Sequence, residues 1–138
     1  MTEPLQTTVR RLGVGDEDVI RRLAEKAPQT ALLADDRTIF LAAFDGDDPI
    51  GFVFGYDLPR RRGAPSILFV YEIDVEPAYQ RRGIAKRLLT ELLRIGHSRG
   101  AAEAFVLTDH DNVAANALYA SLGGVRSDVV MWDFPEKG

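Results

Sequence analysis

One short segment, Val75–Lys86, carries the residues best suited to binding a charged ligand. It contains the run Gln80–Arg81–Arg82–Gly83–Ile84–Ala85, which follows an apolar stretch and opens a helical pattern. The first N–H groups of a helix have no intrahelical partner, and the helix dipole is positive at that end. A glycine there lets the backbone approach a ligand closely, and such turns bind phosphate oxygens. Taken alone, the segment is also compatible with a plain turn whose arginines are solvated.

Glu72 and Asp74 precede this segment and are candidates for proton transfer. They are two residues apart on a predicted strand, so both side chains should face the same side. Carboxylates on an apolar strand cost folding free energy unless they are paired or serve a function. Either one can act as a general base. Alternatively, both are strand-end carboxylates that form salt bridges or are solvated. Tyr119 is a candidate proton donor, or else a tyrosine packed on the apolar face of its helix.

The composition restricts the chemistry. The chain has 138 residues, which suits a single domain over 1–138. It has no cysteine and two histidines, His97 and His110, so we expect neither a thiol nucleophile nor a metal site. The net charge of −4 argues against a nucleic acid, and it is compatible either with a cationic partner or simply with solubility. No apolar run resembles a signal peptide or a membrane span, so we expect a cytoplasmic protein without membrane contact.

The hydrophobic pattern predicts one mixed sheet with helices on both faces. Apolar or alternating runs predict strands at Thr7–Leu12, Ile39–Phe44, Ile50–Tyr56, Ile67–Val75, Ala104–Thr108 and Val129–Phe134. Helical patterns are expected from Asp16 to about Lys26, within Gln29–Asp36, from Ile84 to Arg99 and from Asn112 to Leu122. Turns of several residues are expected at 45–49 and 59–65, and the third long strand should be central and covered on both faces. The strand–helix–strand unit Ile67–Thr108 predicts a parallel pair.

Two motifs in the right order resemble those of the GNAT superfamily of acetyltransferases. That superfamily carries a Gln/Arg-x-x-Gly-x-Gly/Ala loop and, later, an Asn-x-x-Ala-x-x-Leu/Phe-Tyr-x-x-x-Gly helix. This sequence has Gln80–Ala85 for the first and Asn112–Gly123 for the second. The resemblance implies an α/β GNAT fold: a single mixed, mostly antiparallel sheet with a central parallel strand pair and about four flanking helices. It also implies that acetyl-CoA is the cofactor.

The same resemblance implies roles for individual residues. The loop would bind the pyrophosphate of CoA largely through backbone amides, Asn112 would contact the pantetheine arm, and Tyr119 would lie beside the departing sulfur. The expected cofactor-binding residues are Ile73, Val75, Gln80, Arg81, Arg82, Gly83, Ile84, Ala85, Lys86, Asn112, Ala115 and Tyr119. The expected catalytic residues are Glu72, Asp74 and Tyr119. Because the chain has no cysteine, the acceptor amine should attack the thioester directly, and one of the two carboxylates should take its proton.

A narrower resemblance, from about Leu32 to Phe134, is to the type I aminoglycoside 3-N-acetyltransferases. It rests on Leu41–Asp45, Tyr56–Pro59, Tyr71–Glu72, Asp109, Ala117–Tyr119 with Leu122–Gly123, and Val130–Phe134. Glu72 stands where that family has an aspartate, and Asp111–Val113 departs from its more acidic stretch. The resemblance implies a resistance enzyme that acetylates a cationic aminoglycoside, at N3 of the deoxystreptamine ring, and a possible homodimer. The expected acceptor-binding residues are Asp35, Asp36, Tyr56, Asp57, Glu72, Asp109, His110, Asp111 and Asp133, most of them carboxylates.

Two other functions remain open at this point. The chain could be a GNAT enzyme for another small amine or for a protein amine, or a non-catalytic module that binds acyl-CoA. The presence of Glu72, Asp74 and Tyr119 together argues against the non-catalytic module, because such a module has no use for a base and a proton donor.

Overall fold

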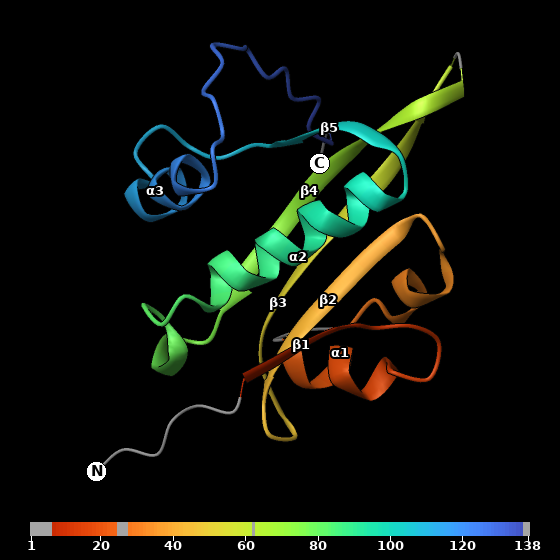
Figure 1. Ribbon diagram of the computed structural model, residues 1–138, viewed down its shortest axis with the longest axis vertical. Helices are drawn as coiled ribbons and strands as arrows, with labels where there is room; N and C mark the ends of the chain where they lie inside the picture. The colour runs from red at the N-terminus through yellow and green to blue at the C-terminus, as the bar shows by residue number, and fades with distance from the viewer. Residues whose placement is uncertain (1–6, 25–27, 62, 137–138) are drawn as a thin grey trace.

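A five-stranded sheet forms the centre of the computed structural model, which describes residues 7–24, 28–61 and 63–136. The strands are β1 (Thr7–Arg11), β2 (Thr38–Asp45), β3 (Asp48–Arg60), β4 (Gly63–Val75) and β5 (Ala101–Val106). They lie in the order β1-β2-β3-β4-β5; the first four run antiparallel, and β4 and β5 are parallel. The predicted α/β fold class is therefore confirmed, but the parallel pair, which was predicted to be central, lies at one edge of the five strands (Figure 1). The strand β4 is accordingly not covered on both faces along its whole length, since Tyr71, Glu72 and Asp74 are exposed.

Helices cover both faces of the sheet. The described helices are α1 (Glu17–Leu23), α2 (Ile84–Ser98) and α3 (Val113–Ser121), with 3-10 turns η1 (Thr30–Ala34) and η2 (Pro77–Tyr79). The long helix α2 lies across β3 and β4 on one face, and α1 and η1 pack on the opposite face (Figure 1). The sequence predicted about four helices, and in the described residues the second of these is the 3-10 turn η1.

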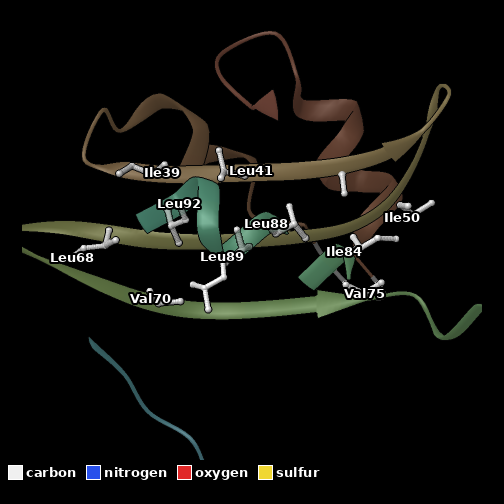
Figure 2. Packing of buried hydrophobic residues seen from close by; sticks show 12 residues of the cluster. Ile39, Leu41, Ile50, Leu68, Val70, Val75, Ile84, Leu88, Leu89 and Leu92 are labelled. Atoms are coloured by element: carbon white, nitrogen blue, oxygen red, sulfur yellow. The ribbon is translucent and has the colours of Figure 1, made fainter. Parts of the chain in front are cut away.

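The main core lies between α2 and the sheet. Ile84, Leu88 and Leu92 point from α2 toward the strands, where Leu41 and Leu68 are fully or almost fully buried (Figure 2). The helix approaches β4 closely at Gly96, where an added Cβ would lie 2.8 Å from Cδ2 of Leu68. This packing follows from the apolar period of the helix, and it fixes the start of α2 at the end of β4.

Both predicted turns are shorter in the structure. Asp45 pairs with Asp48, so only Gly46 and Asp47 connect β2 to β3. The strands β3 and β4 continue through most of the predicted 59–65 turn, until Arg60 pairs with Gly63. A register irregularity between Leu58 and Arg60 accommodates the proline between them, which has no N–H to donate to the ladder. The predicted helix from Asp16 ends at Leu23, and residues 25–27 lie outside the described residues.

Two predictions for the C-terminal part were wrong. The strand predicted as buried at Ala104–Thr108 is β5 over Ala101–Val106, and most of its residues are exposed because it lies at the sheet edge. The predicted strand Val129–Phe134 is irregular and exposed, since it pairs with no strand of the described chain. No helix among the described residues has the length and apolar character needed to cross a bilayer.

Candidate active site

A bulge interrupts β4 beside the predicted base. Phe54 pairs with Glu72 while the next residue, Gly55, pairs with Val70, so Tyr71 has no partner on β3. The strands approach closely here: a Cβ added at Gly55 would lie 2.7 Å from the carbonyl oxygen of Phe69. Glycine is therefore required at this position, and the bulge places both Tyr71 and Glu72 on the face opposite α2.

The ladder between strands β4 and β5 ends at this bulge. Their parallel ladder ends at the pair Val70–Val106, whereas β4 continues to Val75. The stretch of β4 that contains Ile73 and Val75 thus has β3 on one side and no ladder to β5 on the other. Backbone groups on that side are available to an extended ligand lying alongside the strand. Both residues were predicted to bind the cofactor.

The predicted phosphate loop lies between η2 and α2. Gly83 is the N-cap of α2 with φ of 79°, and Arg81 has φ of 63°, so two residues of this turn have the left-handed conformation. The side chain of Gln80 donates a hydrogen bond to the carbonyl oxygen of Val75 (2.9 Å), which ties the turn to the end of β4. No side chain caps this helix start and its first turn has no acidic residue, so its N–H groups can bind an anion.

Exposed cations surround this helix start. Arg82 lies over the ring of Tyr79 with 5.8 Å to the centroid, and Tyr79 donates a hydrogen bond to Asp45 (2.9 Å), which anchors η2 to the β2–β3 turn. The exposed Lys86 lines a surface hollow together with Gly83. Glycine at the cap, unpaired amides and nearby positive charge together fit a pyrophosphate group. Of the remaining predicted loop residues, Ile84 is buried in the core and Ala85 packs against it.

The two predicted bases share one face, as expected from their spacing. Glu72 pairs with Phe54 and Asp74 with Phe52, and these phenylalanines pack in the cluster covered by α1 and η1, so both carboxylates lie on the face opposite α2. Both are exposed. Oδ1 of Asp74 accepts a hydrogen bond from the N–H of Val75 (3.0 Å), whereas no hydrogen bond or salt bridge to Glu72 is found among the described residues.

An aromatic surface that was not predicted from the sequence lies beside Glu72. Tyr71 is 57% exposed; its ring centroid lies 5.6 Å from that of Tyr56 and 5.7 Å from that of Phe69. Phe69 in turn stacks on Phe105 of β5 at 4.6 Å. The alternation of aromatic residues on two paired strands was the signal that could have predicted this surface.

Acidic residues near this aromatic surface raise the pKa of one of its tyrosines. The pKa of Tyr56 is raised by burial and by the nearby Tyr71, Asp35 and Glu72. Asp35 is exposed and, with Asp36, lines a second hollow between β1 and η1. The negative charges of the predicted acceptor residues Asp35 and Glu72 thus both act on Tyr56, which belongs to this aromatic surface.

Tyr119 and Asn112 lie on the other face, on or beside α3. Tyr119 is half-buried against the α2 core, and burial raises the pKa of its phenol, so it is protonated at neutral pH. Oδ1 of Asn112 accepts a hydrogen bond from the N–H of Ala115 (3.1 Å), so this side chain caps α3. Asn112 therefore holds the start of α3 in place.

Asp57 is buried and paired with two arginines, which gives it a role in holding the fold together. Its side chain is almost fully buried, and Oδ2 accepts a hydrogen bond from Nε of Arg99 (3.0 Å) and lies 3.6 Å from Arg37. Burial alone would raise the pKa of Asp57, but the Ser66 hydroxyl and the two guanidinium groups outweigh it and lower the pKa. We therefore leave Asp57 out of the proposed acceptor surface.

The other predicted acceptor residues lie on segments that follow β5. Asp109, His110 and Asp111 follow β5 in an exposed turn, which Asn116 holds to α3 by donating to the carbonyl oxygen of Asp109 (3.0 Å). Asp133 is exposed in the irregular C-terminal segment. Among the described residues, no cluster of three potential metal ligands is found.

Comparisons with known proteins agree with this geometry. The model of the acetyltransferase (GNAT) family matches residues 8–124. A mycothiol acetyltransferase from Arthrobacter sp. (strain FB24) is 32% identical over 95 residues, which cover 66% of this chain and 29% of that protein. The N-alpha-acetyltransferase RimI of Mycobacterium tuberculosis is 38% identical over 95 residues, covering 68% and 56%. The chain thus spans less than two thirds of the length of either relative.

A solved structure resembles nearly the whole chain. It is an aminoglycoside acetyltransferase, HMB0005, from an uncultured soil metagenomic sample, with a TM-score of 0.84 and 29% sequence identity. The match covers 96% of this chain and all of that one. With the family match over most of its length and the uncapped helix start after β4, this chain belongs to the acetyltransferase (GNAT) family, whose cofactor is acetyl-CoA.

Proposed function

We propose that this chain transfers an acetyl group from acetyl-CoA to a primary amine of a cationic small molecule, most specifically an aminoglycoside. The observation that carries the proposal is the position of Glu72. It lies on an open face beside aromatic rings and next to the point where β4 and β5 separate, and its charge and that of Asp35 both raise the pKa of Tyr56. A base, an apolar platform and further negative charge are together what a polycationic sugar requires.

The cofactor site would be built from three parts of the chain. The first-turn amides of α2, with Gly83 and Lys86, would bind the pyrophosphate. The unpaired side of β4 at Ile73 and Val75 would hold the pantetheine arm by backbone hydrogen bonds. When bound, acetyl-CoA supplies an acetyl group activated as a thioester.

Glu72 would take the proton of the acceptor ammonium at its carboxylate, directly or through water, which leaves the amine nitrogen free to bond to the acetyl carbon. We favour Glu72 over Asp74 because Asp74 accepts a hydrogen bond from the Val75 N–H, whereas Glu72 lies beside Tyr56 and Tyr71. Tyr119 would hold a proton on its phenol oxygen for the sulfur as the carbon–sulfur bond breaks.

The acceptor would lie across Tyr56 and Tyr71. Aromatic faces attract ammonium groups and contact the apolar faces of sugar rings. Asp35 and Glu72 would pair with two amines of the same molecule, which matches a ligand with several positive charges. The similarity to an aminoglycoside acetyltransferase over nearly the whole chain supports this class of acceptor. The predicted position of acetylation is N3 of the deoxystreptamine ring.

A second candidate is transfer to another amine, such as that of a protein N-terminus or a diamine. It is favoured by the similarity to RimI, whose sequence is 38% identical to this chain over 95 residues. The same base and cofactor loop would serve this reaction, and the acceptor surface alone would differ.

The test is a thiol-release assay with acetyl-CoA and a panel of amines: gentamicin, sisomicin, kanamycin, apramycin, spermidine and a lysine peptide, together with a peptide bearing a free N-terminus. Product position is read by NMR. Turnover of gentamicin or sisomicin with the acetyl group on N3 supports the narrow proposal. Turnover of a peptide or polyamine alone would contradict the aminoglycoside proposal and leave acetyl transfer in place. If acetyl-CoA binds but no amine is acetylated, the chain is a binding module.

A further inference from the structure

The turn before α2 contains a residue whose backbone conformation needs support from the rest of the chain. Arg81 has φ of 63°, and among the described residues it is the only one other than glycine with a positive φ. Such a conformation is unfavourable for a residue with a side chain, and it persists only where surrounding contacts fix the backbone. Gly83, two residues later, is the N-cap of α2 and part of the proposed pyrophosphate site. The geometry of that site therefore depends on the contacts that hold the turn.

One of these contacts comes from a distant segment of the chain. Tyr79, the last residue of η2, donates a hydrogen bond to Oδ2 of Asp45 at 2.9 Å. Asp45 lies 34 residues earlier, at the end of β2, where it pairs with Thr7 of β1 on one side and with Asp48 of β3 on the other. A residue that is paired on both sides is a fixed support, so this bond holds η2 to the sheet.

The ring of Tyr79 connects this hydrogen bond to the turn itself. The ring packs against the main core, so it is held by packing as well as by its hydroxyl. The guanidinium of Arg82 lies over the same ring, with 5.8 Å to the centroid. On the other side of Arg81, the side chain of Gln80 donates to the carbonyl oxygen of Val75 (2.9 Å). Arg81 thus lies between two residues whose side chains are anchored, one on Tyr79 and the other on β4.

The charges around Tyr79 indicate a role in positioning rather than in attracting the ligand. The hydrogen bond to Asp45 raises the pKa of Tyr79, and burial and the charges of Asp45, Asp48 and Glu76 raise it further, so the phenol keeps its proton at neutral pH and remains a donor. Negative charges near an anion site oppose binding of the anion. A favourable contribution of Asp45 must therefore come from the geometry of its hydrogen bond.

From these contacts we infer that Asp45 is a positioning residue for acetyl-CoA: through Tyr79 it holds the turn 80–83 in the conformation that presents the amides of α2 to the pyrophosphate. The inference rests on the proposed pyrophosphate site. It adds to that site a residue of the β2–β3 turn, which lies outside all the segments predicted to bind the cofactor.

Calorimetric titration with acetyl-CoA tests the inference. Tyr79→Phe removes the hydroxyl and keeps the ring beneath Arg82, whereas Asp45→Ala removes the acceptor; each should raise Kd about 3- to 10-fold, as expected for the loss of one hydrogen bond. The double variant should bind no more weakly than the weaker single variant, because both changes remove the same bond. Asp45→Asn keeps an acceptor oxygen and should bind like wild type. Asp47→Ala is the control, since it removes an exposed carboxylate from the same turn and should leave Kd unchanged.

A second ligand separates the loss of the turn from general destabilisation. S-acetylpantetheine has the same thioester and pantetheine arm but no pyrophosphate, and NMR titration should show the same affinity for it in Tyr79→Phe as in wild type. Equal losses for both ligands, additive losses in the double variant, or an unchanged Kd for acetyl-CoA in Tyr79→Phe and Asp45→Ala would each overturn the inference. A wild-type chain that binds acetyl-CoA no more tightly than S-acetylpantetheine would instead contradict the proposed pyrophosphate site, and the inference with it.

Discussion

Oδ2 of Asp57 and Nε of Arg99 lie 3.0 Å apart, which joins β3, close to the turn of the long β3–β4 hairpin, to the residue after α2. Arg99 is 42 residues further along the chain. The pair fixes the C-terminal end of the helix over the sheet, as Gly96 fixes its packing on Leu68. The opposite end of the same helix is the proposed pyrophosphate site, so the pair contributes to the orientation of that site.

Asp57→Asn should lower the free energy of unfolding at pH 7 by about 1–3 kcal/mol, because two guanidinium groups lose their carboxylate. The pKa of Asp57 is lowered in the folded state, so its contribution is present above the ordinary aspartate pKa and is lost as the pH falls through the folded value. Urea unfolding at pH 7 and pH 3 should show a smaller difference from wild type at pH 3. Asp36→Asn is the control, since its exposed contact with Arg99 should contribute under about 0.5 kcal/mol.

Gly83→Ala should weaken acetyl-CoA binding roughly tenfold, because the left-handed conformation at the start of α2 disfavours a side chain by about 1–2 kcal/mol. Calorimetric titration measures the change. Gly15→Ala is a matched control: it also has positive φ and open space around its Cβ, but it lies before α1. Equal losses of acetyl-CoA affinity in both variants would show that the effect is general destabilisation.

Glu72→Gln should lower kcat by about 100-fold or more while the dissociation constant of acetyl-CoA stays the same, since a general base contributes about 10²–10⁴-fold. Steady-state kinetics and acetyl-CoA titration are the measurements. Asp74→Asn is isosteric, on the same strand and face, and should lose far less activity. A larger loss in Asp74→Asn would reassign the base.

Tyr119→Phe should lower kcat by roughly 10–100-fold, because the sulfur loses its proton donor. Burial raises the pKa of Tyr119, so the wild-type phenol remains protonated, and able to donate, up to a pH above the ordinary value of about 10. The kcat of the wild-type chain should therefore fall only above that pH, as the phenol loses its proton. The kcat of the variant, which has no phenol at this position, should show no such fall. An unchanged kcat would leave Tyr119 with a packing role.

Tyr71→Ala should raise KM for the cationic acceptor roughly 3- to 30-fold, the range expected when an ammonium group loses an aromatic face. The KM for acetyl-CoA should not change. Tyr71 is 57% exposed, so stability should be little affected, and thermal unfolding checks this. Tyr71→Phe retains the ring and should behave like wild type; an acceptor KM that is unaffected by Tyr71→Ala would exclude the aromatic platform.

Local pattern determined the parts of the site that depend on one segment. The apolar period of residues 84–98 requires a helix with one buried side, and Gly83 marks its start, so the sequence alone located the uncapped amides after β4. The spacing of Glu72 and Asp74 likewise placed them on one face, because side-chain direction alternates along a strand.

Tertiary structure decided what depends on residues far apart in the chain. The register of β3 against β4 places the bulge at Tyr71 and joins Tyr56, Tyr71 and Phe69 into one surface, which no single segment specifies. Asp57 was predicted to bind the acceptor, but in the structure its carboxylate pairs with two arginines that are distant from it in the chain. Val129–Phe134 has the composition of a strand and is irregular in the structure, where it pairs with no strand of the described chain; a strand requires a neighbour as well as a sequence.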